Sequence, residues 1–454
     1  MTQVFQLSAF NSSLYNKTVQ ALSPLDGRYR SKVESLASYF SEEALNKARL
    51  EVEVRYFIAL SKDAGVKELP RVNAKQEKAL VALISGFTEK EAAEIKTIEK
   101  TTNHDVKAVE YYLKKKVASM SGLKKHIEFI HFGLTSEDVN NLAYGLMISR
   151  ALKDSIIPQQ AALIADIKKL ASATATLRMV SLTHGQPATP TTLGKEMMVF
   201  VDRLSRQLTG LKAFRMQGKF GSAVGNYSAQ KAAYPTLKWE AFGSKFMKSL
   251  GLIPLKNTTQ INPHDDIAEL SHIMVRFNTI GIDFSRDIWS YISRGVFGQK
   301  VIKGEVGSST MPHKVNPIDF ENAEGNLGLA SALFDHFALK LPISRLQRDL
   351  SDSTVQRSIG VAFGYHILAL SSLKKGIGKL SVNKKVIQEE LDAHPELIAE
   401  AIQTVLRKNG VPNAYEKMKE LTRGSSVTKA DLRAFIETLK IPEGDKKNLL
   451  KLAA

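Results

Sequence analysis

Residues 304–317 have the types and the spacing that proton-transfer chemistry needs. The segment reads Gly-Glu-Val-Gly-Ser-Ser-Thr-Met-Pro-His-Lys-Val-Asn-Pro. Its prolines lack a backbone N–H and disfavour helical geometry in the preceding residue, so a loop is predicted. The free N–H groups of this loop and the Lys314 ammonium form an anion-binding concavity, beside which Ser308 and Ser309 can move a proton. The alternative, a flexible glycine–serine connector, has no use for a lysine and an asparagine between prolines.

A second segment with chemical potential is 181–190, which reads Ser-Leu-Thr-His-Gly-Gln-Pro-Ala-Thr-Pro. Its glycine and prolines predict an irregular segment that exposes His184. An imidazole titrates near neutral pH, which suits a general acid or base. A lone histidine is usually structural, but this polar context favours a catalytic role.

Two more polar clusters interrupt the apolar pattern. Residues 101–105 read Thr-Thr-Asn-His-Asp, which is either a capped helix start with Thr102 or Asn103 as the N-cap, or a functional group centred on His104. Residues 135–138 read Thr-Ser-Glu-Asp, the pattern of a capping box. Because a helix N-terminus also offers unpaired N–H groups to an anion, this second cluster can both cap and bind.

Arginine-rich segments at two places offer further anion-binding groups. Residues 26–30 read Asp-Gly-Arg-Tyr-Arg, whose guanidinium groups suit a phosphate, although a surface turn is the alternative. A later set of anion-binding residues is predicted at a helix start: Arg345, Arg348, Asp349, Ser353, Thr354 and Arg357.

Long helices must position these segments, because apolar residues recur at steps of three and four. Residues 193–211 and 267–288 each predict a long helix with one apolar face. Another helix is predicted to begin near Ser136 and to kink at Pro158. These stripes predict an all-α fold with a central bundle of long helices.

Shorter elements complete the prediction. Strands are expected only near 179–183 and 218–227. A helix over 396–408 is expected to follow Pro395 and to stop at Gly410. Boundaries near residues 125 and 378 divide the chain into an N-terminal helical domain, a central long-helix bundle and a small C-terminal helical domain: 1–125, 126–378 and 379–454.

Composition narrows the classes of function. The 454 residues are 43% hydrophobic and 24% charged, as in a soluble globular protein. The 63 Lys and Arg against 46 Asp and Glu give +17, but these basic residues are dispersed, so we expect no dedicated nucleic-acid partner. Neither a membrane span nor a signal peptide is expected, and a chain without cysteine fits the cytoplasm. No dinucleotide fingerprint, phosphate loop or histidine metal spacing occurs, so we expect no cofactor and no metal.

The motifs together resemble the fumarase/aspartase superfamily and, within it, the bacterial type of the adenylosuccinate lyase family. The resemblance covers about residues 20–445 and leaves the first twenty residues as an expected extension, with an end at Ala454 that is earlier than in most relatives. The segments that carry it are 23–29, 101–107, 135–138, 183–190 and 307–317.

The resemblance implies β-elimination of fumarate from adenylosuccinate, and from the succinylocarboxamide ribotide of purine synthesis, without a cofactor. It makes Ser308 the base and His184 the acid, with His104 as the alternative acid–base group, and it implies a homotetramer whose sites draw on three chains. The alternatives are another lyase of this superfamily, of the argininosuccinate or carboxymuconate type, or a non-catalytic protein of the same fold. The residues expected to contact substrate are Arg28, Tyr29, Asn103, His104, Asp105, Thr135, Ser136, Gln260, Ser309, Lys314, Val315, Asn316, Asn322, Arg348, Ser353, Thr354 and Arg357.

Overall fold

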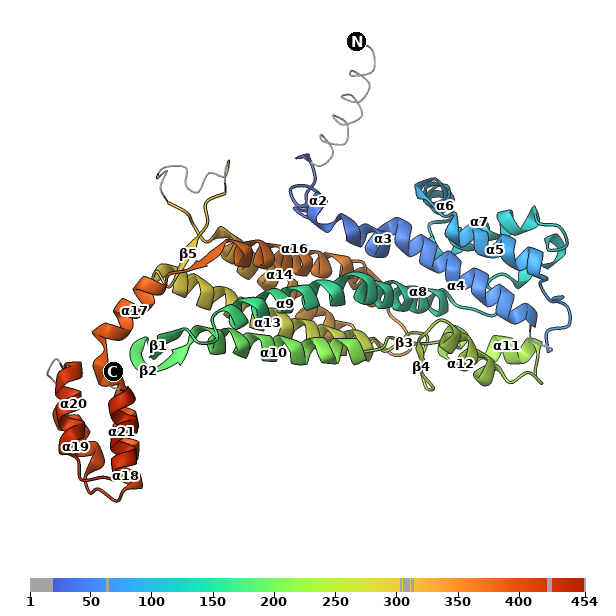
Figure 1. Cartoon of the computed structure of the whole chain (residues 1–454). Helices are drawn as coiled ribbons and strands as arrows, with labels where there is room; N and C mark the ends of the chain where they lie inside the picture. The colour runs from blue at the N-terminus through green and yellow to red at the C-terminus, as the bar shows by residue number, and fades with distance from the viewer. Residues whose placement is uncertain are drawn as a thin grey trace, which may run out of the picture. The chain divides into compact units, whose positions relative to one another are not determined.

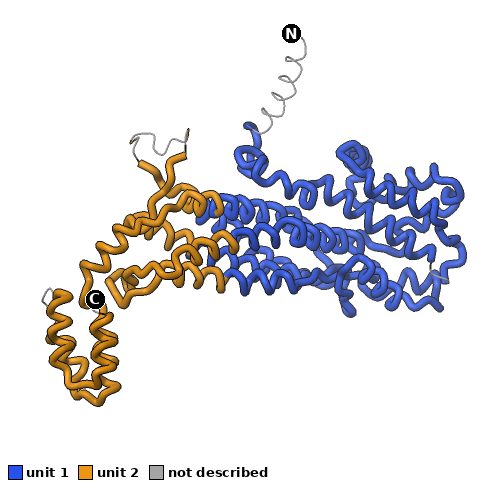
Figure 2. The backbone as a smooth tube through the Cα atoms, viewed as in Figure 1, with its two compact units in different colours: residues 1–163, 204–283, 322–373 blue, residues 164–203, 284–321, 374–454 orange. Residues whose placement is uncertain are grey.

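The computed structural model describes residues 19–62, 65–302, 304, 311, 314–422 and 427–452. The chain forms two compact units (Figure 2). Unit 1 comprises Met1–Leu163, Leu204–Asp283 and Asn322–Leu373, and unit 2 comprises Ile164–Arg203, Phe284–Glu321 and Lys374–Ala454. Each unit combines distant stretches of sequence, so the three sequential domains proposed above stay a prediction.

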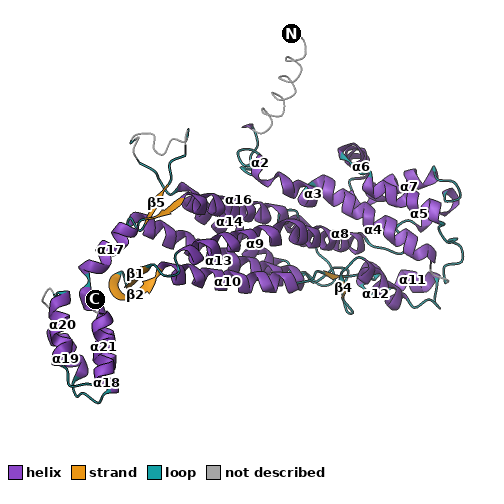
Figure 3. Ribbon diagram, viewed as in Figure 1, coloured by secondary structure: helices purple, strands orange, loops and turns teal. Residues whose placement is uncertain are grey.

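Helices make up most of the described residues (Figure 3), which confirms the all-α class. None of the helices that the structure describes is long and apolar enough to cross a membrane. In chain order, with the labels of Figure 1, the helices are α2 (Arg30–Val33), α3 (Ala37–Phe40), α4 (Glu42–Lys62), α5 (Ala74–Ser85), α6 (Glu89–Thr102), α7 (Asp105–Ala118), α8 (Ser136–Ala151), α9 (Ile157–Ala173), α10 (Leu193–Ala213), α11 (Ser228–Ala233), α12 (Trp239–Ser249), α13 (Asp265–Ser293), α14 (Ile318–Lys340), α15 (Ser351–Gln356), α16 (Ile359–Lys379), α17 (Lys384–Ala393), α18 (Ala399–Lys408), α19 (Ala414–Thr422), α20 (Lys429–Thr438) and α21 (Glu443–Leu452).

The apolar stripes correctly predicted the long helices α10 and α13. Leu193, Met197 and Leu204 of α10 are fully buried, as are Met274 and Phe284 of α13. Their spacing of three or four residues places them on one side of each helix, and burying that side stabilises helices whose opposite faces are polar.

Pro158 produces a local change of helix type. Between α8 and α9 the chain makes a π-helical turn over Leu152–Ile156, and the N–H of Ile157 bonds to the carbonyl of Leu152. Proline cannot donate to the carbonyl four residues earlier, and the wider turn accommodates its ring. The kink predicted at Pro158 stays a prediction, and the observed irregularity is this π-turn directly before it.

Strands occur only as short pairs among the described residues. β1 (Arg178–Thr183) pairs antiparallel with β2 (Gln186–Thr192), as expected near 179–183. β3 (Gln217–Gly218) pairs parallel with β4 (Ile253–Pro254), and β5 (Phe297–Gln299) pairs antiparallel with β6 (Leu380–Val382).

The strand expected over 218–227 was wrong beyond Gly218. Gly221, Ser222, Gly225 and Tyr227 all have positive φ, and a 3₁₀ turn occupies Ser222–Val224. Positive φ is incompatible with a strand, so the backbone folds back on itself here. This segment is a compact turn against the N-terminal end of α8.

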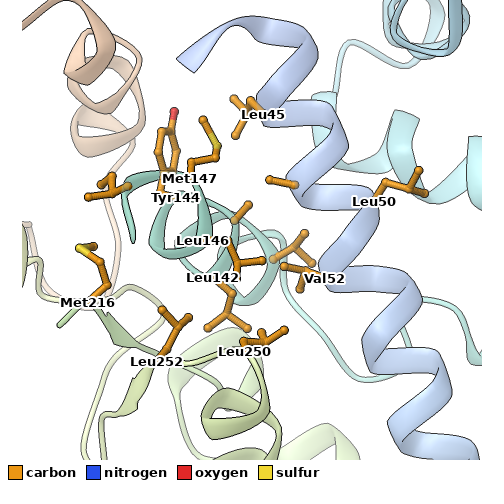
Figure 4. Close-up of a cluster of buried hydrophobic side chains, with 14 of the residues drawn as sticks. Leu45, Leu50, Val52, Leu142, Tyr144, Leu146, Met147, Met216, Leu250 and Leu252 are labelled. Atoms are coloured by element: carbon orange, nitrogen blue, oxygen red, sulfur yellow. The ribbon is translucent and has the colours of Figure 1, made fainter. Parts of the chain in front are cut away.

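The core of unit 1 forms where α4 packs on α8 (Figure 4). Leu50 and Val52 of α4, Leu142 and Leu146 of α8, and Leu252 of the β4 segment are all buried. Each such side chain contributes about 1.5–3 kcal/mol when it leaves water. Their packing fixes α4 and the first turns of α8, the elements that carry several candidate site residues.

Within unit 2, the C-terminal helices α18 to α21 have a core of their own. Ile402 and Leu406 of α18 pack with Leu432 and Ile436 of α20. A 3₁₀ turn begins at Pro395 and leads into α18, and Gly410 with φ 66° follows its end. The predicted helix start and stop are therefore confirmed.

Candidate active site

The junction of α6 and α7 presents His104. Asn103 adopts a left-handed conformation with φ 50° and ends α6, and His104 then caps α7 through Nδ1, which accepts the N–H of Lys107 at 3.2 Å. The N-cap expected at Thr102 or Asn103 was wrong, because Thr102 is still helical and Asn103 is left-handed, whereas His104 is extended. The His104 side chain is 51% exposed, so its Nε2 edge can meet a ligand.

Asp105 lies between two arginines. Its Oδ2 is 2.6 Å from Nη2 of Arg49 and 2.8 Å from Nη2 of Arg357. Burial alone would raise the pKa of Asp105, but the charges of both arginines and the Val106 N–H outweigh burial and hold this pKa below its usual value. Arg49 is fully buried on α4 and also donates to Asn140 at 2.8 Å. The carboxylate of Asp105 on α7 thus joins Arg49 of α4 to Arg357, which directly follows α15.

The start of α8 is tied to the turn of residues 218–225 through Asp138. The Thr135 N–H donates to Asp138 Oδ2 at 2.9 Å, which confirms the predicted capping box. Asp138 Oδ1 also accepts from the buried Lys219 ammonium at 2.7 Å, and its carboxylate accepts the N–H groups of Gly221 and Ser222 at 3.0 Å. A carboxylate with this many donors is rigidly held. Thr135 and Ser136, both predicted substrate contacts, therefore lie on a fixed helix start.

A buried group of charges adjoins this helix start. Glu137, His264 and Asp352 are each no more than 3% exposed. Arg348 Nη1 lies 3.0 Å from Asp352 Oδ2 and 3.6 Å from Glu137 Oε2, and His264 Nε2 lies 3.4 Å from Asp352 Oδ2. The predicted residue Arg348, whose side chain is 22% exposed, is thus held between two buried carboxylates.

The pKa values of the two carboxylates are shifted in opposite directions. Burial raises the pKa of Glu137 to about 7, although His264 and Arg348 oppose this. Burial would also raise the pKa of Asp352, but the His264 hydrogen bond and the Arg348 charge outweigh burial and hold it below its usual value. Glu137 Oε1 and His264 Nδ1 have no hydrogen-bond partner among the described residues. Asp352 is therefore the main counter-charge of Arg348.

Glu137, His264 and Asp352 also have the composition of a metal site, since one ligand atom from each lies within 4.8 Å of the others. Both carboxylates already face the Arg348 guanidinium, and His264 Nε2 is 2.8 Å from Gln356 Nε2. A guanidinium in this position supplies the positive charge that a metal ion would bring. We therefore assign these residues to holding Arg348.

Three other predicted residues lie near Arg348 in the chain or in space. The Ser353 N–H donates to Asp352 Oδ1 at 2.6 Å, and Thr354 on the next position of α15 is exposed. The Gln260 N–H donates to the carbonyl of Gln347 at 3.3 Å. Unit 1 therefore brings Gln260, Arg348 and Ser353 into one neighbourhood.

The N-terminal arginine segment lies beside Arg357. Arg28 is exposed in a turn, with its guanidinium 5.8 Å from the centre of the Tyr29 ring. A pocket of about 340 Å³ lies next to this turn. It is lined by Asp26 and Arg30 and also by Arg357, which is far from them in the sequence. The predicted phosphate segment and Arg357 are thus neighbours.

His184 lies at the turn of the β1–β2 hairpin in unit 2. Thr183 pairs with Gln186, and the two residues between them, His184 and Gly185, have φ of 55° and 73°. Positive φ at both central positions is the pattern of a type I′ hairpin turn. The irregular segment expected over 181–190 was wrong, because Pro187 is accommodated in the edge strand β2. The expected exposure of His184 is confirmed, and its side chain has no hydrogen bond within the described chain.

The segment 304–317 is described in part. Gly304, Met311 and 314–317 are not helical, and α14 begins directly after them at Ile318. Lys314 is exposed, and the carbonyl of Val315 accepts from Gln299 Nε2 at 3.0 Å, which ties the segment to β5. Ser308 and Ser309 lie outside the described residues.

The predicted site residues are divided between the units. Asn316, Lys314, Val315 and His184 belong to unit 2, and the other described ones belong to unit 1. Asn322 at the start of α14 contacts another helix, because its Oδ1 accepts from Ser372 on α16 at 2.7 Å.

Sequence reasoning missed the residues that hold the arginines in place. Arg49, His264 and Asp352 were not selected, and Glu137 was named only as part of the 135–138 motif. One signal was available, since His264 stands in a polar Asn-Pro-His-Asp-Asp run directly before a long apolar stripe. Arg49 gave none, because it lies within a regular helical pattern.

The sequence matches two family models that together cover most of its length. A family model described as a lyase matches residues 27–330, and one described as the adenylosuccinate lyase C-terminal region matches residues 344–454. A curated adenylosuccinate lyase of Legionella pneumophila (strain Corby) is 55% identical over 434 residues, which cover 96% of this chain and 95% of that protein. The adenylosuccinate lyase of Escherichia coli (strain K12) is 52% identical over 432 residues, or 95% of each chain.

A solved structure shows the same fold at low identity. The 3-carboxy-cis,cis-muconate lactonizing enzyme from Pseudomonas putida has a TM-score of 0.73 and 20% identity, and the match covers 92% of this chain and 93% of that one. From the family models and the relatives that match it over nearly its whole length, this chain belongs to the adenylosuccinate lyase family.

Proposed function

We propose that this protein eliminates fumarate from adenylosuccinate to give AMP, and from the succinylocarboxamide ribotide of purine synthesis, in the cytoplasm. The observation that carries the proposal is 55% identity over 96% of the chain to a protein named adenylosuccinate lyase. The site residues discussed above then take the roles that this elimination requires.

The elimination needs a base and an acid. The base removes a weakly acidic proton from the carbon beside a carboxylate, and the acid protonates the departing nitrogen as its bond to carbon breaks. We assign the acid to His184, whose exposed side chain at a tight turn can enter a site without first breaking a hydrogen bond. Ser308 is assigned as the base, with Lys314 to lower the pKa of its hydroxyl. His104 is the alternative acid–base group.

The substrate carries a phosphate and two carboxylates, so the site must offer cations. Arg28 with Tyr29 suits the phosphate, and Arg348 and Arg357 suit the remaining anionic groups. Both of these later arginines are fixed by carboxylates, at Asp352 and at Asp105 respectively. Fixing them in advance lowers the entropy lost when substrate binds. Arginines that are fixed in this way therefore favour the binding of a polyanionic substrate.

We also propose a homotetramer whose sites are shared between chains. Leu329 and Leu339 of α14 are 51% and 72% exposed, which leaves apolar area for a partner chain to cover. His184→Ala and Ser308→Ala variants, each inactive alone, should regain activity when unfolded and reassembled together, with roughly one site in four intact. Mixed tetramers that stay inactive would show that both groups act within one chain.

The reaction itself is tested by following ultraviolet absorbance as the purified protein acts on adenylosuccinate. We expect fumarate to be released from both purine substrates, with and without exhaustive chelation. Argininosuccinate and carboxymuconate serve as comparison substrates and should not turn over. Failure on both purine substrates, or activity that requires added metal, would refute the proposal.

A further inference from the structure

Three helices of unit 1 face one another across a space that none of them fills. A pocket of about 790 Å³ lies between α4, α5 and α12. From α4 it is lined by Arg55, Ile58, Ala59 and Lys62, which follow one another at steps of three, one and three residues. This spacing places them on one face of the helix. The volume falls within the range of pockets that hold small organic molecules.

The floor and one wall of this pocket are apolar. Phe242 and Phe246 of α12 are 8% and 2% exposed, and both rings lie against Tyr56, with centres 6.2 and 5.7 Å apart. Val81 of α5 stands opposite and is 45% exposed. An aromatic floor that belongs to the core is rigid, and the exposed valine leaves apolar surface in contact with water.

The rim of the pocket is cationic. Arg55, Lys62, Lys238 and Lys245 line it, against the single carboxylate of Glu77. Arg55 and Lys62 are paired with Glu51 and Glu77, at 2.8 and 3.0 Å. Lys238 and Lys245 are exposed and form no ion pair with any carboxylate in the described part of the chain. Two positive charges beside an apolar floor therefore lack an ion-pair partner among the described residues.

We propose that this pocket binds a small organic anion with an apolar body, whose anionic group meets Lys238 and Lys245 and whose body lies on Phe242 and Phe246. None of the residues that we assign to catalysis or to contacts with adenylosuccinate lines the pocket. The substrate's multiple charges would need several fixed arginines, whereas this pocket offers flexible lysines around an apolar surface. The pocket is thus a second site of different chemistry, and it does not depend on the proposed reaction.

The test compares two fluorescent probes with the same apolar body, anilinonaphthalene sulfonate and the uncharged phenyl-naphthylamine. Both should bind the wild-type protein with enhanced fluorescence. Val81→Trp fills the pocket from an exposed position and should weaken the binding of both probes by at least about tenfold. Lys245→Glu should weaken the binding of the sulfonate probe alone, by about fivefold, since exposed charge pairs are worth up to about 1 kcal/mol.

Lys248→Glu is the matched control, because Lys248 is an exposed lysine of the same helix that does not line the pocket. It should leave both affinities unchanged, and circular dichroism should show that all variants are folded. The proposal is overturned if the wild type binds neither probe, if Val81→Trp binds both as tightly as the wild type, or if Lys248→Glu weakens the sulfonate as much as Lys245→Glu does.

Discussion

The charged residues around the start of α8 are buried and paired, whereas His184 is exposed at a hairpin turn without a hydrogen-bond partner in the described chain. Lys219 and Asp138 are both 0% exposed, and Asp138 accepts from Thr135 and from Lys219, Gly221 and Ser222 of the turn. The His184 turn closes the antiparallel backbone pairing of β1 with β2. Both regions carry residues assigned to one reaction, yet they differ in nearly every physical property.

The difference follows from the tasks that the two regions have. A buried charge is stable only when it is paired, so the unit 1 group depends on complete pairing and contributes to the fold as well as to the site. A group that transfers a proton must instead approach its substrate and change its protonation state. Changes in the first region should therefore alter stability, and changes at His184 should alter the rate alone.

The largest expected effect is on the rate of His184→Asn. Asparagine tolerates the positive φ of the turn, so the fold should be unchanged while proton transfer is lost. We expect kcat to fall by about 100- to 10,000-fold. Fumarate release and thermal unfolding are measured together, with His126→Asn as the control. If the melting temperature fell and the activity were retained, His184 would contribute to stability rather than to the rate, which is the opposite of what we expect.

The next largest effect is on the stability of Lys219→Met. The variant leaves the buried Asp138 carboxylate without its cation, which costs about 3–5 kcal/mol of unfolding free energy. Denaturant unfolding measures the loss. Lys231→Met removes a partner of Glu240 from an exposed pair and should change stability by about 0.5 kcal/mol or less. Equal losses in the two variants would mean that burial does not set the cost.

Glu137→Gln sharpens the comparison through pH. The pKa of Glu137 in the folded protein is about 7, above its ordinary value of 4.5, so the stability it contributes is complete below pH 4.5 and is lost as pH rises through 7. Glutamine does not titrate, so the variant should gain on the order of 2 kcal/mol relative to wild type between pH 5 and pH 8. The exposed Glu128→Gln is the control and should show no such trend. An unchanged difference between the variant and the wild type over this range would mean that Glu137 is ionised throughout it.

The smallest effect is expected for Arg357→Lys. Lysine keeps the charge, but its ammonium lacks the planar guanidinium that lets arginine bond Asp105 and a ligand at the same time. Because the Arg357 side chain is 42% exposed, we expect little change in melting temperature but a rise in KM of about tenfold. Initial rates over a range of adenylosuccinate concentrations give KM, and Arg433→Lys on α20 serves as the control. An unchanged KM would remove Arg357 from the substrate contacts.

Local features of the chain were readable from the sequence. The apolar steps of three and four predicted α10 and α13, and the Thr135–Asp138 spacing predicted the capping box. These succeed because helix periodicity and capping depend on residues a few positions apart. The His184 hairpin was missed although its cause is also local, since a His-Gly pair that can adopt positive φ at both turn positions was judged only by the prolines around it.

Which charges meet depends on how distant parts of the chain pack together. Asp105 contacts Arg49 and Arg357, which lie 56 and 252 positions away. No local pattern distinguishes Arg49 from the many other basic residues of the chain, and none indicates that Arg357, although predicted to bind anions, meets Asp105. Burial of Glu137 was equally hidden, because a carboxylate in the first turn of a helix ordinarily faces water and complements the helix dipole. Local residue patterns specify the long helices and supply the acid–base and anion-binding groups. Packing of α4, α8 and α15 determined which of these groups are fixed, paired and shifted in pKa, because burial and ion pairing depend on residues far apart along the chain.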